Sequence, residues 1–422
     1  MKKYILLLVG LGVLVVGYYG VSQKVLPRFK KPSEVSLLVD PILKTTIIKL
    51  IVAFEKQNPD IKVKMTLGSS DTDLRHSLLT QVLSSKSEII DVFWGDVIWS
   101  SEFISNGWLL PITKDISQGE QDRYLKAPLE SCRGIDSELY CLPIFSDAGL
   151  LYYRKDILEK NNILPPTTWD ELVTSSKKIM ADNPGMAGIV FQGSQYEGLV
   201  TGFLEYVWGN NGDITTNGKF TVDSPSNQEA LQFMVDLIYK YKIAPESVVS
   251  FKEEESRKSF QDGNALYLRN WPYVLSRLRG TALENKVGII PMVHGIGGVS
   301  ASTLGGASVM VSRFSEAPRE SVLLAKFLAS DEAEKILALD EGVLPSVKAL
   351  YQDKDIVAKN PDVTNLYEVL LHTKPRPVVK GYREASSIMQ KYIHQALTRE
   401  LSAKDALSKM QQDLDVFQNR SQ

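Results

Sequence analysis

The chain has 422 residues, of which 44% are hydrophobic and 23% charged, and its formal net charge is −2. This is the composition of a globular protein, and the length is sufficient for two or three domains. The near-neutral charge and the lack of a long basic run argue against nucleic acid as a partner.

An uncharged apolar stretch runs from Tyr4 to Val21, directly behind Lys2 and Lys3. Its length is at the lower limit for a helix that spans the roughly 30 Å hydrocarbon core of a membrane. The preceding lysines favour a cytoplasmic N-terminus, which would place the rest of the chain on the extracytoplasmic side. We expect a signal or anchor helix over residues 1–22 and a solvated tether over residues 23–34.

An uncleaved anchor and a cleaved signal peptide are both open interpretations of this stretch. A cleavage site needs small residues, and Tyr18 and Tyr19 stand there instead. No Cys follows, so no lipoprotein attachment site is present. We therefore expect a protein of the periplasm or extracytoplasmic face that is anchored to the inner membrane, with the cleaved signal as the alternative.

Strand and helix patterns alternate over the next sixty residues. Strands are recognised as short apolar runs or period-two alternation, and helices as apolar positions at i, i+3, i+4 and i+7. The expected order is strand, helix, strand, helix, strand over residues 35–39, 45–57, 61–67, 74–83 and 89–94. This order predicts a parallel sheet covered by helices.

Ligands of such sheets bind outside the carboxyl ends of the strands. Asp40, residues 68–71 and Asp96 stand at these expected strand ends. This edge is therefore the expected ligand side of the sheet.

Further elements follow in mixed order. Residues 143–154 form a second apolar stretch, and residues 294–306 are rich in Gly and Ser, as in a loop. Helices are expected over residues 169–180, 227–241, 252–261, 319–328 and 332–339, strands near 288–291 and 309–311, and a helical rhythm over 385–417.

The chain contains two cysteines, Cys132 and Cys141. In an oxidising compartment such a pair usually forms a disulfide. Turn-forming residues between them would allow a hairpin. We expect the disulfide, and two free buried thiols are the alternative.

Sequence signatures of enzymes and cofactors are missing. There is no phosphate-binding loop. The dinucleotide-binding pattern would need a Gly at position 300 after the glycine cluster at 295–298, and this chain lacks it. The four His residues are scattered, at positions 76, 294, 372 and 394. We expect no catalytic residue, no cofactor and no metal, although counting alone leaves a pair of glycosidase carboxylates open.

Aromatic and polar residues are interleaved over residues 93–99, 195–198, 205–212 and 269–273. Sugar sites need this mixture, because a pyranose stacks its C–H face on a ring while its hydroxyls bond to polar and charged side chains. Stacking on an indole contributes on the order of 1–3 kcal/mol, and a micromolar ligand needs about −8 kcal/mol. A single Trp or Tyr is more often a core residue than a binding platform. We expect these stretches at strand ends and loops, however, and that position favours a binding role.

Six sequence blocks resemble the extracellular solute-binding proteins of ATP-binding-cassette sugar importers. The blocks are residues 54–63, 142–156, 166–172, 260–272, 304–306 and 342–346. Their order and spacing extend the resemblance over roughly residues 35–417. Residues 193–212 are most similar to the trehalose- and maltose-binding branch of this family.

The resemblance implies an α/β fold of the two-lobed, type II periplasmic-binding-protein kind, with hinge strands that cross between the lobes. Lobe one would comprise residues 35–144 and 302–340, and lobe two residues 145–301 and 341–422. The implied function is capture of a di- or oligosaccharide or a glucoside, such as trehalose, maltose or glucosylglycerol, and delivery to a membrane permease. We expect a monomer that is not an enzyme.

The resemblance also implies a set of sugar contacts, in which Trp271 stacks on the sugar while carboxylates and Arg side chains bind hydroxyls. The expected contacts are Arg75, Asp96, Asp147, Tyr152, Tyr196, Glu197, Trp271, Tyr273, Gly306 and Arg376. One departure from the family is Ala307, where close relatives often have an aromatic residue, so one wall would be smaller and a glucosylated polyol could enter. The second is the missing lipoprotein Cys, whose function the anchor would replace.

Three other interpretations stay open. An anchored extracytoplasmic glycosidase would hydrolyse the bound oligosaccharide, and a sensory module would report ligand state to a receptor. A binding protein for a glycerol phosphodiester would need a basic cluster in the cleft, for which Arg75 and Arg376 are the candidates.

Overall fold

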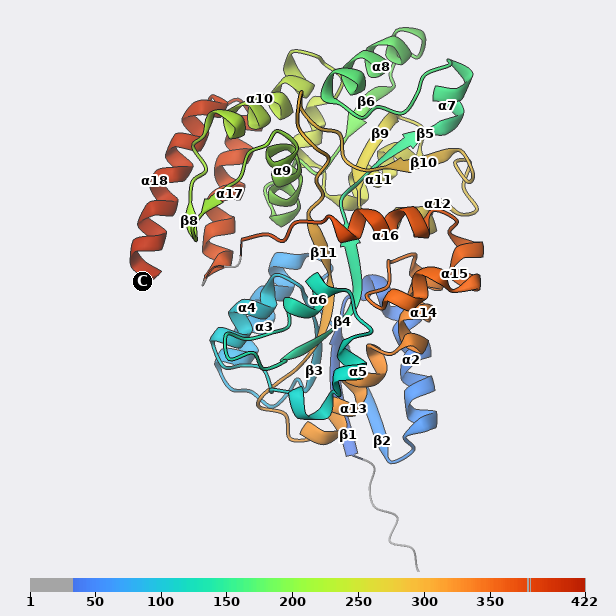
Figure 1. Ribbon diagram of the computed structural model, residues 1–422, viewed down its shortest axis with the longest axis vertical. Coiled ribbons are helices and arrows are strands. Elements are labelled where there is room, and N and C mark those ends of the chain that lie inside the picture. Colours follow the sequence, from blue (N-terminus) through green and yellow to red (C-terminus); the bar gives the residue numbers. More distant parts are fainter. Residues whose placement is uncertain (1–32, 378, 380, 422) are drawn as a thin grey trace, which may run out of the picture.

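The computed structural model describes residues 33–377, 379 and 381–421. They form two α/β lobes, each built on its own sheet, with strands that pass from one lobe to the other (Figure 1). The helix expected over residues 1–22 lies outside the described residues. Strand β1 begins at Ser33, so the last two residues assigned to the tether belong to a strand.

Lobe one contains a five-stranded sheet in the order β2-β1-β3-β11-β4. Strand β1 runs parallel to β2 and β3, as the alternating pattern predicts, whereas β11 is antiparallel to β3 and β4. The strands are β1 (Ser33–Val39), β2 (Ile61–Leu67), β3 (Val92–Asp96), β4 (Cys141–Ala148) and β11 (Leu304–Val311). The strand expected over 89–94 is therefore shifted toward Asp96.

Helices from residues 44–130 and 318–371 pack around this sheet. Amphipathic α2 shows the reason, because its periodic apolar positions, including Ile47, Leu50 and Phe54, are buried in the core. The helices are α2 (Lys44–Gln57), α3 (Thr72–Ser84), α4 (Trp99–Ser105), α5 (Gln118–Gln121), α6 (Lys126–Glu130), α13 (Pro318–Leu328), α14 (Asp331–Glu341), α15 (Lys354–Lys359) and α16 (Val363–Leu371).

Residues 343–371 pack with lobe one, and not with lobe two as the resemblance implies. Leu344 pairs with Ser146 of β4, Val347 pairs with Tyr124, and α16 contacts β4. The buried carboxylate of Glu334 on α14 accepts the backbone N–H groups of Ser346 and Val347. These hydrogen bonds hold the chain on lobe one after α14 ends.

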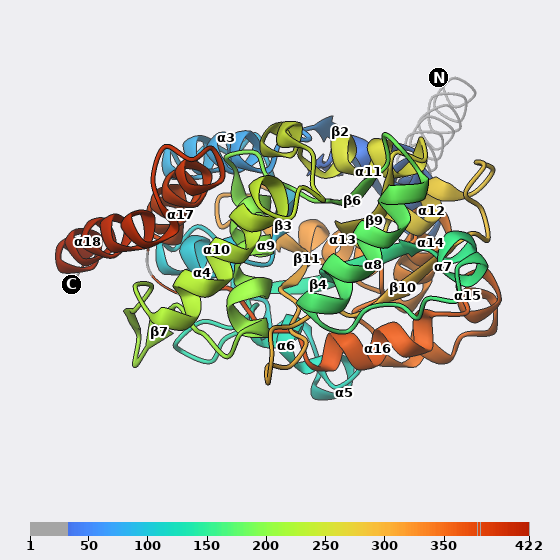
Figure 2. The same ribbon diagram turned by 90° about the horizontal axis from the view of Figure 1, so that it is seen from above.

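Lobe two contains a four-stranded sheet in the order β10-β5-β9-β6. Its strands are β5 (Leu150–Arg154), β6 (Ala187–Val190), β9 (Ala265–Asn270) and β10 (Val287–Ile290), and a small hairpin joins β7 (Thr215–Thr216) and β8 (Lys219–Phe220). Its helices are α7 (Lys155–Lys160), α8 (Trp169–Asp182), α9 (Glu197–Gly209), α10 (Pro225–Tyr239), α11 (Glu253–Gln261), α12 (Val274–Leu278), α17 (Tyr382–Leu397) and α18 (Ala403–Ser421). The two C-terminal helices pack on each other at the outer side of this lobe (Figures 1 and 2).

Helix α9 corrects the expectation that residues 205–212 lie at a strand end or loop. Every residue of α9 is buried, and Tyr206 and Trp208 belong to the core of lobe two. A helix that is buried all round carries no amphipathic period, so its sequence does not show the pattern of a surface helix.

Three chain segments cross between the lobes side by side. The first links β4 to β5 at Gly149, the second leads into β11 through Ser302 and Thr303, and the third passes Lys374 after α16. The Ser302 hydroxyl donates to the Gly149 carbonyl at 2.7 Å. The Lys374 N–H donates to the Ser302 carbonyl, and the Leu304 N–H donates to the Lys374 carbonyl, each at 2.9 Å.

Candidate ligand-binding site

A cavity of about 590 Å³ lies between the two lobes. Lobe one contributes the carboxyl ends of β1, β3 and β4 and the starts of α3 and β11, which is the edge expected from the strand order. Lobe two contributes the starts of α9 and α11 and the turn after β9. A ligand in this cavity would therefore touch both lobes.

The cavity wall brings together nine of the ten predicted contacts. These are Arg75, Asp96, Asp147, Tyr196, Glu197, Trp271, Tyr273, Gly306 and Arg376. They come from segments as far apart in the sequence as α3 and the crossing segment after α16.

Tyr152 is the exception, and the prediction that it lines the site is wrong. Its side chain is fully buried, because β5 is an inner strand between β9 and β10. Its hydroxyl donates to the backbone carbonyl of Trp271 at 2.7 Å. Tyr152 therefore supports the turn that carries Trp271 from behind.

Arg376 joins the two lobes at the back of the cavity. It donates to Asp96 at the end of β3 at 2.7 Å and to Glu197 at the start of α9 at 2.9 Å. Glu197 also accepts hydrogen bonds from Tyr382 and Ser386. Burial raises the pKa of Glu197, and the Arg376 charge and these hydrogen bonds oppose that shift.

Asp147 faces the cavity with an unsatisfied acceptor. Its Oδ1 atom is buried and has no hydrogen-bond partner among the described residues. Burial, together with the neighbouring negative charge of Asp96, raises the pKa of Asp147 to about 7. The carboxylate can therefore accept a hydrogen bond that only a bound molecule or solvent would supply.

The half-buried Trp271 ring is placed for stacking. The guanidinium carbon of Arg269 lies 4.3 Å from the ring centroid, so one ring face is covered. At the ring edge, a side chain at Gly305 would start 3.0 Å from the indole, which shows how closely β11 passes. Trp271 lines the cavity, so the part of its ring that Arg269 does not cover can contact a ligand.

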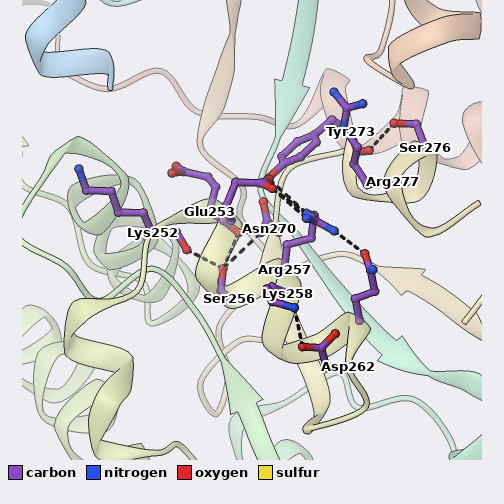
Figure 3. A network of polar contacts seen from close by, with 12 residues as sticks. Lys252, Glu253, Ser256, Arg257, Lys258, Asp262, Asn270, Tyr273, Ser276 and Arg277 are labelled. Atoms are coloured by element: carbon purple, nitrogen blue, oxygen red, sulfur yellow. Dashed lines mark hydrogen bonds and ion pairs between the residues drawn. The ribbon is translucent and has the colours of Figure 1, made fainter. Parts of the chain in front are cut away.

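Residues at the start of α11 and in the turn after β9 form a polar network (Figure 3). The Tyr273 hydroxyl donates to Glu254 at 2.7 Å, and Arg257 pairs with the same carboxylate at 2.9 Å. Burial raises the pKa of the neighbouring Glu253, whereas hydrogen bonds to Tyr196 and Trp271 oppose the shift. The network fixes Tyr273 at the cavity wall.

Lys252 forms a second link between the lobes. Its ammonium group lies 2.6 Å from Asp71, the N-cap residue of α3, and 5.1 Å from the centroid of the Tyr196 ring. Lys252 and Asp71 were not among the predicted contacts. Asp71 had a signal in the sequence, because it stands at an expected strand end, but nothing in the local pattern marks Lys252.

Other lining residues were also not predicted as contacts. Asp40 stands at a strand end and Trp94 in an aromatic stretch, so the sequence carried a signal for both, whereas Phe145, Arg277 and Glu341 had none. Arg277 pairs with Glu341 at 3.0 Å, and Arg75 pairs with Asp40 at 2.8 Å.

The cavity wall is acidic overall. Among the described residues, nine carboxylates and four cationic side chains line it. Each of the four cations already pairs with a carboxylate: Arg75 with Asp40, Lys252 with Asp71, Arg277 with Glu341, and Arg376 with Asp96 and Glu197.

Three further features concern the expectations on chemistry and compartment. Cys132 and Cys141 form a disulfide with a sulfur–sulfur distance of 2.05 Å. Within residues 33–421, as far as they are described, no group of His, Cys, Asp and Glu could hold a metal ion. No helix in the same part of the chain combines the length and apolar character that a membrane crossing requires.

Comparisons with known proteins agree with this architecture. The family model of bacterial extracellular solute-binding proteins matches residues 40–335. The chain belongs to this family. A probable ABC transporter-binding protein of Deinococcus radiodurans is 33% identical over 370 residues, which cover 85% of this chain and 87% of the relative.

Solved structures of other proteins show the same fold. The maltose-bound MalE3 protein of T. maritima aligns with a TM-score of 0.87 and 37% identity, over 91% of this chain and all of that one. The GacH receptor of Streptomyces glaucescens aligns with a TM-score of 0.83 over 93% of this chain and 99% of its own, at 21% identity. These matches confirm the two-lobed α/β fold.

Proposed function

We propose that this solute-binding protein is the substrate-binding component of an ATP-binding-cassette importer and captures a di- or oligosaccharide or a glucoside between its lobes. The observation that carries the proposal is the partly exposed Trp271 ring, which lines a cavity between two lobes together with the unsatisfied acceptor of Asp147. Similarity to the maltose-bound MalE3 protein supports a sugar ligand.

The cavity suits a neutral sugar in size and chemistry. Its volume of about 590 Å³ falls within the range of small-molecule sites. Ala307 lines the wall where an aromatic side chain would take more space. The ligand could therefore be a glucosylated polyol as well as trehalose or maltose. The cavity carboxylates accept hydrogen bonds from hydroxyls, and Trp271 stacks on a C–H face.

The charge balance speaks against a glycerol phosphodiester. A phosphate needs cationic side chains that are free to pair with it. All four cations of the described wall already pair with carboxylates.

 Five of the nine lining carboxylates take part in these pairs, namely Asp40, Asp71, Asp96, Glu197 and Glu341, and the remaining four do not. An anionic ligand would therefore meet net negative charge.

Capture would proceed by closure of the lobes. A ligand that touches both lobes only in the closed form shifts the equilibrium by its differential affinity. A shift from 1:99 to 99:1 needs about 5.5 kcal/mol of such difference, which stacking plus several hydrogen bonds can supply. The closed protein would then deliver the ligand to a membrane permease.

We also propose that the protein acts as a monomer, outside the cytoplasm, and that its N-terminal stretch anchors it to the inner membrane.

A titration of the full-length chain in detergent tests the proposal. Tryptophan fluorescence and calorimetry would be followed with trehalose, maltose, sucrose, glucosylglycerol, glucose and glycerol 3-phosphate, and the mixtures would then be analysed for products. We expect saturable binding of one glycoside without turnover. Binding of none of the glycosides would overturn the proposal, and a cleaved product would establish a glycosidase instead.

A further inference from the structure

An ion pair lies buried behind Trp271 in lobe two. Arg269 on β9 and Glu205 on α9 are each 1% exposed. They share two hydrogen bonds, from Nε to Oε2 at 2.8 Å and from Nη2 to Oε1 at 2.5 Å. The Nη1 group of Arg269 donates to Gln192 at 3.0 Å. Neither member of the pair lines the cavity.

One side of this pair faces the Trp271 ring. The guanidinium of Arg269 lies over the ring at 4.3 Å from the centroid, in cation–π contact. Because Glu205 binds the guanidinium through two parallel hydrogen bonds, the plane of the cation is fixed in direction as well as in position. The ring therefore rests on a rigid charged group.

The other side of the pair faces the hinge. The Thr303 N–H, in the second crossing segment, donates to Glu205 Oε1 at 3.3 Å. A side chain at Gly149, in the first crossing segment, would start 1.8 Å from the same oxygen and 2.5 Å from Arg269 Nη2. The pair thus touches two of the three segments that must rotate when the lobes open and close.

The helical repeat of α9 places Glu205 against the crossing segments. Glu197, Thr201 and Glu205 are spaced by four residues, so they share one helix face. Along that face, Glu197 binds Arg376, the Thr201 carbonyl accepts the Thr303 hydroxyl at 2.9 Å, and Glu205 accepts the Thr303 N–H. One helix face therefore contacts the crossing segments from the cavity to the ion pair.

We propose that Glu205 and Arg269 are positioning residues, which hold the Trp271 ring in an orientation set by the hinge strands. Ligand affinity then depends on a pair that never touches the ligand. The proposal rests on the proposed function, because it takes Trp271 as the ring on which the sugar stacks.

The test replaces the pair as a unit in the full-length protein. Replacement of a buried ion pair by apolar residues of similar volume often leaves stability unchanged, whereas removal of one partner does not. The variant is therefore Glu205→Leu with Arg269→Met. Affinity would be measured with maltose by calorimetry, and the ring would be observed by fluorine NMR of protein labelled with 5-fluorotryptophan. The Trp271 resonance is assigned by its loss in Trp271→Phe.

We expect the folded double variant to bind maltose at least tenfold more weakly and to show a shifted or broadened Trp271 resonance. A folded variant with affinity within twofold of the wild type and an unchanged resonance would overturn the proposal. Should the double variant fail to fold, Glu205→Gln gives the same two readouts with a smaller expected change.

Glu334→Gln is the matched control. Glu334 is another carboxylate at 1% exposure, but it accepts hydrogen bonds from Ser346 within lobe one. It should leave the Trp271 resonance and the maltose affinity unchanged. If the wild type binds no glycoside, the proposed function fails by itself, and the resonance of the folded double variant still decides whether the pair positions the ring.

Discussion

Asp147 shows at the scale of one residue how a binding wall lowers stability. Its carboxyl group has a pKa of about 7 in the folded protein against an ordinary 3.8, because of burial and the charge of Asp96. The folded state therefore holds the proton more tightly than the unfolded chain. This stabilising contribution is complete below pH 4 and is lost as the pH rises through 7.

The variant Asp147→Asn tests this linkage, because an amide stays neutral at every pH. We expect the ligand-free variant to exceed the wild type in unfolding free energy by about 3–4 kcal/mol at pH 8 and to match it near pH 4. Urea unfolding between pH 4 and pH 8 measures the difference. An equal difference at both ends of this range would contradict the assignment to Asp147.

Trp271 is the residue on which the binding energy should depend most. Removal of its ring in Trp271→Ala forfeits the stacked area, so we expect an affinity loss of about 1–3 kcal/mol, or about 5- to 150-fold. Trp271→Phe should keep most of the affinity. Calorimetry with the glycoside that the wild type binds provides the measurement, and Trp169→Phe, at a partly buried residue packed against the core of lobe two, serves as control.

At the scale of elements, the sequence predicts those parts whose side chains alternate between core and solvent. Helices α2 and α8 each have one buried face, and both lie within a few residues of their expected positions. Helix α9 is buried on every side and escaped prediction. The placement of residues 343–371 on lobe one depends on long-range contacts such as that between Leu344 and Ser146, which no local pattern reveals.

The same division applies to the site. Asp96 and Trp271 stand at strand ends, where topology alone predicts ligands, and both line the cavity. The sequence cannot tell an inward-facing strand residue from an outward-facing one without the register, which is why Tyr152 was misplaced. Lys252 and Glu253 come to the cavity only because lobe two places the start of α11 opposite α3.

The disulfide links the end of one element to the start of the next. Cys132 follows α6, and Cys141, nine positions further along the chain, begins β4. Closure of so short a loop in the unfolded chain should stabilise lobe one by about 2–3 kcal/mol. We expect the double variant with Cys132→Ser and Cys141→Ser to unfold at lower temperature in calorimetry. Its sugar affinity at 25 °C should stay within twofold, because neither residue lines the cavity.

At the scale of the whole molecule, the lobes are joined by ion pairs as well as by crossing strands. Arg376 bridges Asp96 and Glu197 deep in the cavity, and Lys252 binds Asp71 near the start of two helices that face each other. The pair between Lys252 and Asp71 spans the two lobes, so we expect it to break when they separate. Part of the free energy of closure therefore comes from the protein itself, and this part should weaken with salt where the pair is exposed.

Lys252 offers the sharpest test, because its pair with Asp71 is partly exposed, at 40% and 27% for the two side chains. Exposed pairs contribute about 0.2–1 kcal/mol, so Lys252→Met should raise the dissociation rate of the ligand by up to about fivefold. The effect should disappear in 1 M salt, where charges are screened within about 3 Å.

Lys335→Met is the matched control for this experiment, because Lys335 pairs with Asp353 at similar exposure, 32% and 22%, and with Asp355, in both cases wholly within lobe one. Stopped-flow displacement at low and high salt compares the two variants. If Lys335→Met accelerates release as much as Lys252→Met does, a general loss of surface charge is responsible. If only Lys252→Met does so, and only at low salt, the pair between Lys252 and Asp71 holds the closed lobes together.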